Sequence, residues 1–212
     1  LRELNVSIPE IKGFMEHRSA SGMEKLLSAQ IRELDERLSH LRTMKKTLVS
    51  RHQDMMALLH LDLSEISVVQ KEKSCLAVVP VEQELPTAAD VEQVIGAVKR
   101  YSLQRLHDAV YGSMIAVDQL HQGSYDRYEA LYVELPRLST QKGLHIRPGG
   151  QYLRAFCKGS WDNLPGRYEE ILAYARAHGL ELYGYSYETG INESVINGFD
   201  EYITQIEIPI QI

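Results

Sequence analysis

The sequence feature that most constrains the fold is a heptad pattern in the first third of the chain. Residues recur in alternating steps of four and three, at Leu27, Ile31, Leu34, Leu38, Leu41, Lys45, Leu48, His52, Met55 and Leu59. A period of about 3.5 residues is typical of a left-handed coiled coil. We predict a dimerising coiled-coil helix over residues 21–61, beginning at the capping sequence Ser21-Gly22-Met23-Glu24. No other segment carries the pattern, so we expect a second copy as partner; the alternative is an amphipathic helix on its own domain.

A shorter helix is predicted before the coiled coil. The sequence Ser7-Ile8-Pro9-Glu10 fits a capping box with a proline in the first turn, so this helix should run from Ile8 to about His17. The chain starts without Met, inside an amphipathic pattern. We therefore expect residues 1–20 to be the remnant of a preceding domain.

The composition changes at Asp62. Twelve of the 14 glycines and all 12 tyrosines lie beyond this point, which indicates that residues 62–212 form a globular domain. Apolar runs and turn signals predict strands at residues 65–70, 74–81, 112–117, 127–134, 144–147, 151–157, 180–188 and 202–210, and helices at 88–107 and 162–178. The order strand–strand–helix–strand–strand therefore occurs twice.

This repeated order indicates an internal duplication. Tyr111-Gly112 recurs as Tyr183-Gly184, and Glu134-Leu135-Pro136 recurs as Glu207-Ile208-Pro209. We predict an α+β fold in which two halves, related by an approximate two-fold axis, form one antiparallel sheet with both helices on one face. The other face should curl around a groove between the halves.

The focal residue of the second half is Glu188. Side chains alternate between the two faces of a strand, which places Leu182, Gly184, Ser186 and Glu188 on one face and Tyr183, Tyr185 and Tyr187 on the other. We expect the tyrosine face to pack against a helix, and the small residues beside Glu188 to leave space for a cationic or hydrogen-bonding ligand. The matching position in the first half is Ala116, so the groove would hold one carboxylate. The alternative is a strand-end glutamate in water.

Charge and cysteine content exclude several classes of function. The net charge is −6, with 10 Lys and Arg against 8 Asp and Glu in residues 1–60 and 13 against 21 in residues 61–212, so the second part suits cations better than nucleic acid. Cys75 and Cys157 form no disulfide framework, which favours a reducing cytoplasm. No apolar run is long enough to cross a membrane. The histidines share no ligand spacing and no phosphate loop occurs, so we predict neither a metal nor a cofactor.

The chain resembles the MerR family of transcription regulators. Residues Leu1 to Lys12 resemble the last helical hairpin of the family's winged-helix DNA-binding domain, and the long helix resembles its antiparallel dimerising coiled coil. The duplicated part resembles the GyrI-like effector-binding domain of its multidrug-sensing members. The resemblance implies a homodimeric, ligand-responsive regulator, an activator, whose effector is an aromatic or cationic small molecule. Ligand binding would change the twist of promoter DNA so that RNA polymerase engages.

The resemblance also implies residues of the ligand site. Glu188 matches the family's buried drug-binding glutamate, and Tyr202 matches a pocket tyrosine. Aromatic faces attract cations, so Tyr152 and Trp161 are added from residue type, with core packing or a rim position as the alternative. The candidate ligand-binding residues are Glu188, Tyr202, Tyr152, Trp161, Ser186 and Gly184.

Two other functions stay open at this point. Some GyrI-like domains are hydrolases of reactive small molecules, and a Glu188 with a raised pKa would serve there as the general base. A plain dimeric scaffold is the third reading, but it does not explain a carboxylate in one half only. No motif for nucleophilic catalysis occurs, so we predict a binding domain rather than an enzyme. Glu134 is a further acid in an apolar strand, which we expect to face solvent.

Overall fold

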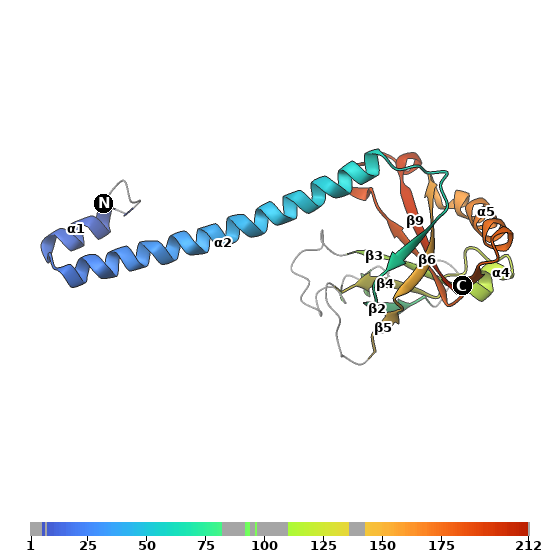
Figure 1. Ribbon diagram of the computed structural model, residues 1–212, viewed down its shortest axis with the longest axis horizontal. Helices are drawn as coiled ribbons and strands as arrows, with labels where there is room; N and C mark the ends of the chain where they lie inside the picture. The colour runs from blue at the N-terminus through green and yellow to red at the C-terminus, as the bar shows by residue number, and fades with distance from the viewer. Residues whose placement is uncertain are drawn as a thin grey trace. The chain divides into compact units, whose positions relative to one another are not determined.

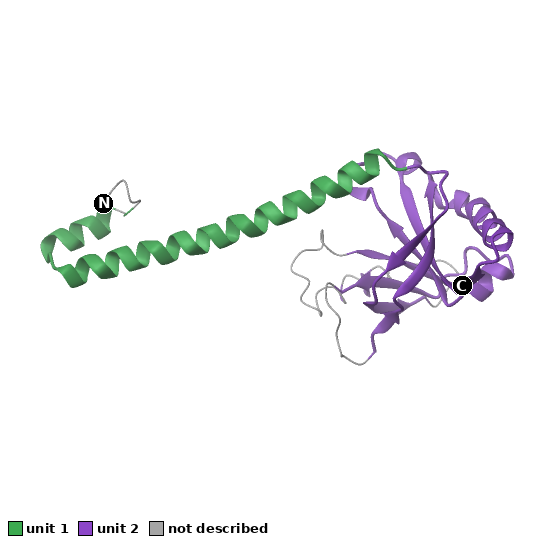
Figure 2. Cartoon of the chain, in the orientation of Figure 1, with its two compact units in different colours: residues 1–61 green, residues 62–212 purple. Residues whose placement is uncertain are grey.

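A computed structural model describes residues 6, 8–81, 92–93, 96, 110–135 and 143–211 of the 212-residue chain. The chain divides into two compact units, residues 1–61 and residues 62–212 (Figure 2). The division falls at the position where the glycine and tyrosine content rises. In the part of the chain that the structure describes, no helix is long and apolar enough to cross a membrane.

The first unit consists of two helices, α1 (Ile8–Glu16) and α2 (Ala20–Leu59). Both were predicted from the sequence, and α2 has 40 residues. Its N-cap is Ser19 rather than Ser21, because the extended backbone of Ser19 lets its Oγ accept a hydrogen bond from the amide of Gly22 at 3.0 Å. Ser21 already lies inside the first turn of the helix.

The heptad residues of α2 lie on the surface of the single chain. Exposed apolar side chains of this seam are Leu27, Ile31, Leu34, Leu38, Leu41, Leu48 and Leu59. A seam of this length on one helix leaves the apolar area in water unless another helix covers it. The described residues of the chain do not cover it.

The second unit is built on one antiparallel sheet. Its strands are β1 (Ser67–Lys71), β2 (Ser74–Pro80), β3 (Tyr111–Ala116), β4 (Ala130–Glu134), β5 (His145–Arg147), β6 (Gly150–Lys158), β7 (Glu181–Leu182), β8 (Tyr185–Gly190) and β9 (Ile203–Gln211). Their order across the sheet is β1-β6-β9-β8-β3-β4-β2-β5, and β7 adds to β9. Every pairing is antiparallel.

This order has the symmetry that the duplication requires. It reads the same from both ends when β1 is exchanged with β5, β2 with β6, β3 with β8 and β4 with β9. The halves join through the pairing of β3 with β8. The first strand of each half also pairs with the second strand of the other half, β1 with β6 and β5 with β2. The helix predicted at residues 88–107 lies outside the described residues, apart from three helical positions.

The strand registers correct the predicted equivalence of Glu188 with Ala116. Glu188 pairs with Ile206, directly before the second Glu-Ile-Pro motif, and Tyr111 pairs with Val133, directly before the first Glu-Leu-Pro motif. Tyr111 therefore occupies the position of Glu188 in the first half. The carboxylate is still absent from that half, but the repeated Tyr-Gly pairs are not structural equivalents.

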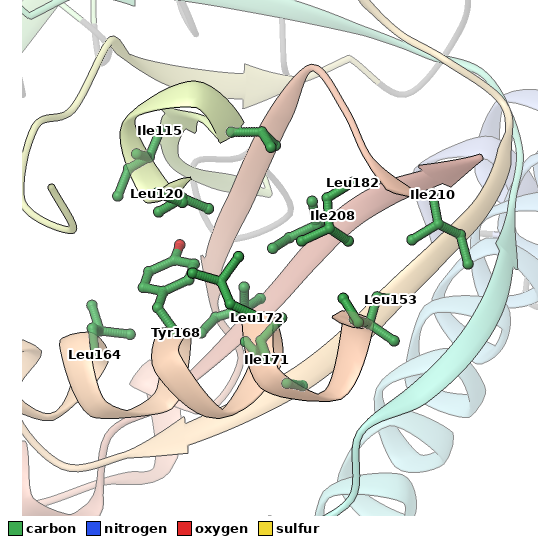
Figure 3. Close-up of a cluster of buried hydrophobic side chains, with 14 of the residues drawn as sticks. Ile115, Leu120, Leu153, Leu164, Tyr168, Ile171, Leu172, Leu182, Ile208 and Ile210 are labelled. Atoms are coloured by element: carbon green, nitrogen blue, oxygen red, sulfur yellow. The ribbon is translucent and has the colours of Figure 1, made fainter. Parts of the chain in front are cut away.

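Helix α5 (Leu164–Ala177) packs against one face of the sheet, beside β6 and β9 (Figure 1). Its buried residues recur at helical spacing, at Leu164, Tyr168, Ile171, Leu172 and Ala175. Figure 3 shows Tyr168, Ile171 and Leu172 pointing toward the strands that carry Leu182 and Ile208. The short helix α4 (Val117–His121), which the sequence did not predict, closes the same core with Leu120.

The face that α5 covers is the opposite of the predicted one. Ser186 and Glu188 lie toward α5, whereas Tyr187 packs on the other face with Tyr132 and Tyr152. The sheet curls, so its second face forms a core of its own, and tyrosines fill that core. The predicted continuous strand is also interrupted, because Gly184 has a φ of +69° between β7 and β8.

Candidate functional site

The carboxylate of Glu188 is the centre of a hydroxyl cluster on the α5 side of the sheet. Tyr168 of α5 donates a hydrogen bond to Oε1 at 2.6 Å. Ser113, its ladder partner on β3, and Tyr128, in the connection before β4, each donate to Oε2 at 3.1 Å. Three segments far apart in the sequence thus converge on one side chain, which is 4% exposed.

No Lys or Arg among the described residues pairs with Glu188. Burial raises the pKa of its carboxyl, and the hydroxyl donors Tyr168, Ser113 and Tyr128 offset only part of this rise. A buried carboxylate without a counter-ion is costly to keep charged. The site therefore has a buried acid, hydroxyl donors that orient it, and no positively charged partner among the described residues.

Glu207 is the second buried acid of this sheet, and it has counter-ions. It lies on the opposite face, where Arg147 pairs with its Oε2 and the Nζ of Lys71 lies 3.1 Å from the same oxygen. The guanidinium of Arg147 also stacks on the rings of Tyr152 and Tyr187, at 4.9 and 4.5 Å from their centroids. Glu207 therefore has two positively charged partners, whereas Glu188 has none among the described residues. The pair of Glu207 with Arg147 was not predicted from the sequence.

The inner wall of the Glu188 site is aromatic. Tyr168 is fully buried, and because its own proton goes to Glu188, the Oγ of Ser186 donates to its phenol oxygen at 2.8 Å. The ring of Tyr125 stacks on that of Tyr168, with centroids 5.7 Å apart and planes 6° from parallel. Burial and the charge of Glu188 raise the pKa of Tyr128 and of Tyr168, so both phenols remain protonated donors.

An outer acid lies next to this wall. Glu193 accepts hydrogen bonds from Tyr111 at 2.6 Å and from Tyr202 at 2.9 Å, and it raises the pKa of Tyr111 to about 12. Gly190 makes this arrangement possible, since a Cβ there would lie 2.1 Å from the hydroxyl of Tyr202 and 2.6 Å from the carboxylate of Glu193. Burial is the largest cause of the raised pKa of Tyr202, Glu193 adds to it, and the charge of Glu188 makes a smaller contribution.

The structure brings together half of the predicted site residues. Glu188 and Ser186 share a face and share Tyr168 as partner, whereas Tyr202 donates to Glu193 and is linked to Glu188 only through the charge of that carboxylate. Sequence reasoning missed Ser113, Tyr111, Tyr125, Tyr128, Tyr168 and Glu193. A polar Ser113 between apolar residues of a strand is the one local signal that was available.

The other three predicted residues lie elsewhere. Tyr152 is on the opposite face of the sheet, where its hydroxyl donates to the carbonyl of Pro148 at 2.6 Å. Trp161 is 65% exposed and meets the ring of Phe199 edge-on at the surface. Gly184 has a backbone role. Its carbonyl oxygen accepts a hydrogen bond from the amide of Val117 at the turn between β7 and β8. Tyr152 therefore does not lie beside Glu188, while ligand-binding roles for Trp161 and Gly184 stay predictions.

A cavity of about 460 Å³ lies between the first half of α5 and β6. It is lined by Leu63, Phe156, Cys157, Lys158, Asp162, Asn163, Gly166, Arg167 and Glu170. Glu188 is not part of its wall. The cavity therefore does not mark the predicted ligand site.

Comparisons with known proteins show the fold. No protein-family model and no curated protein matches the sequence. EcmrR, solved with DNA in the EcmrR-RPo assembly, is 14% identical over 99% of this chain and 79% of that chain, with a TM-score of 0.50. The C-terminal domain of EcmrR is 12% identical over 69% of this chain and 97% of that one, also at 0.50. A hydrolase from Listeria innocua is 8% identical over 72% of this chain and 95% of that chain, with a TM-score of 0.49. The second unit thus has the fold of the EcmrR C-terminal domain.

Proposed function

We propose that this chain is a ligand-responsive transcription regulator whose second unit binds small aromatic cations at Glu188. The single observation that carries the proposal is the buried, hydroxyl-coordinated carboxylate, which has no counter-ion among the residues that the structure describes. A ligand cation supplies the missing positive charge. The tyrosine rings beside it add cation–π attraction of about 0.5–2 kcal/mol each.

The proposal includes a homodimer formed through α2. Its apolar seam is exposed over the whole helix in the single chain, and a second copy is the partner that carries the same heptads. Promoter DNA and RNA polymerase are proposed as further partners, by analogy with EcmrR, which was solved with DNA. This part of the proposal rests on fold similarity and on the sequence resemblance.

Hydrolysis is the second candidate function. The raised pKa of the Glu188 carboxyl favours it, because a more basic carboxylate accepts a proton more readily. Against it stands the surrounding chemistry: the described neighbours of Glu188 contribute hydroxyl groups that already occupy both carboxylate oxygens. A regulator returns its ligand unchanged, whereas a hydrolase consumes it.

Calorimetric titration tests the proposal. Ethidium, an aromatic monocation, and phenanthridine, its uncharged parent ring system, would each be added to the purified chain. We expect ethidium to bind with a stoichiometry of one per chain and phenanthridine to bind at least tenfold more weakly. Chromatography of the ligand after incubation should return it intact. Equal affinities would contradict the proposal, and turnover of a panel of small esters and epoxides would favour the hydrolase.

A further inference from the structure

Arg167 of α5 holds the beginning of the second unit. Its Nη2 donates to three consecutive carbonyl oxygens, those of Leu63 at 3.1 Å, Ser64 at 3.3 Å and Glu65 at 3.1 Å. Its Nη1 pairs with Glu170, and the side chain is only 11% exposed. Residues 62–65 follow directly after α2 and the end of the first unit in the sequence. This guanidinium therefore fixes the backbone at the point where the chain leaves the long helix.

The fixed segment is a small hydrogen-bonded turn. The Oδ1 of Asp62 accepts from the amide of Ser64 at 2.9 Å and from its Oγ at 2.6 Å, and the amide of Glu65 donates to the carbonyl of Asp62 at 3.3 Å. Arg167 binds the carbonyl oxygens of the same turn. The turn has no core of its own, so its order depends on these polar contacts.

The next residue of α5 is Tyr168, which binds Glu188. Consecutive residues of an α-helix point in directions about 100° apart, and here one side chain reaches the Asp62 turn while the other reaches the buried carboxylate. A displacement of this helical turn changes both contacts together.

Ligand binding at Glu188 must disturb this arrangement. The carboxylate is 4% exposed and accepts three hydroxyl donors, so a cation that pairs with it takes the place of at least one of them. Tyr168 is the donor on Oε1 and the one that belongs to a helix. Once it loses that acceptor, its buried hydroxyl has a poorer partner, and the helical turn that carries it readjusts.

We propose that Arg167 and Tyr168 form a relay that couples ligand occupancy of Glu188 to the order of residues 62–65. The relay rests on the proposed function, since it requires a ligand at Glu188. In the free protein the hydrogen bond from Tyr168 to Glu188 holds α5 in the position from which Arg167 donates to the carbonyl oxygens of residues 63–65. When a cation displaces Tyr168, Arg167 withdraws and the turn loosens.

Hydrogen–deuterium exchange of the full chain tests the relay, with ethidium as the ligand and calorimetry as the independent measure of binding. Saturating ethidium should raise the exchange rates of the Ser64 and Glu65 amides by about fivefold or more, the factor that corresponds to one net hydrogen bond. Tyr168→Phe should raise them without ligand. Tyr128→Phe is the matched control, because it removes a hydroxyl that donates to the same carboxylate but does not belong to α5. It should leave both exchange rates unchanged.

Arg167→Lys separates the relay from binding. This variant should bind ethidium about fivefold more tightly than the unchanged chain, because binding no longer breaks the Arg167 contacts, and its two turn amides should exchange fast with and without ligand. If ethidium binds the unchanged chain while both rates stay the same, the relay is refuted and the ligand site stands. Equal effects of Tyr128→Phe and Tyr168→Phe would also refute the relay. If ethidium does not bind at all, the proposed function itself fails.

Discussion

Replacing Glu207 by Gln should destabilise the protein strongly. The side chains of Glu207 and Arg147 are 3% and 4% exposed, so the substitution leaves the Arg147 guanidinium buried without its counter-ion. Removal of one partner of a buried ion pair costs about 3–5 kcal/mol. The Arg147 contacts with Tyr152 and Tyr187 remain and keep the loss from rising further. Urea unfolding at pH 7, followed by circular dichroism, measures the loss directly.

The matched control is Glu188→Gln. It removes an equally buried carboxylate that has no described cationic partner, and the amide keeps an oxygen for Tyr168 while Ser113 and Tyr128 turn to accept from its nitrogen. We expect a change of less than about 1 kcal/mol, or a slight gain in stability. Equal losses in the two variants would refute the reasoning that one acid serves the fold and the other is available to a ligand.

Three further predictions concern assembly, packing and pH. Replacing Leu34 and Leu41 together by Asp should give monomers in sedimentation, because charges would lie in the seam; an unchanged dimer would refute the coiled coil. Gly112→Ala should lower stability by about 1–3 kcal/mol or more, since its Cβ would lie 1.9 Å from the carbonyl oxygen of Glu188; an unchanged urea midpoint would contradict this. Because the folded-state pKa of Glu188 is raised above 4.5, its contribution to stability is fully present below that pH and is lost as the pH rises through the raised pKa. Unfolding free energies of the unchanged chain should therefore fall relative to those of Glu188→Gln between pH 4.5 and 8, and parallel curves would contradict the raised pKa.

The order of the elements was predictable because local signals mark where they begin and end. The capping sequence before α1, the heptads of α2 and the turn at Pro148-Gly149 are read directly from the sequence. The break at Gly184 was not, since a glycine inside an apolar run fits both a strand and a turn, and only the paired neighbours of β7 and β8 fix its positive φ. Which face α5 covers also depends on the curl of the whole sheet.

The focal acid was predictable, but its surroundings were not. Glu188 and Ser186 share a face through the two-residue period of a strand. Ser113, Tyr128 and Tyr168 lie 75, 60 and 20 residues away in sequence, and only the folded chain brings their hydroxyls together. Tyr152 went to the other face for the same reason, because its position depends on the pairing of β6 with β9.

The central claim is that Glu188 is the counter-charge of a cation site. Its most direct test is calorimetric titration of Glu188→Gln with ethidium and with phenanthridine, using Glu134→Gln as the control. The claim predicts a loss of about 10- to 100-fold in ethidium affinity, the equivalent of a lost charge-assisted hydrogen bond, and less than about threefold for phenanthridine. Glu134→Gln should change neither. Equal losses for both ligands would mean that Glu188 shapes the site without neutralising charge, and no loss for ethidium would contradict the claim.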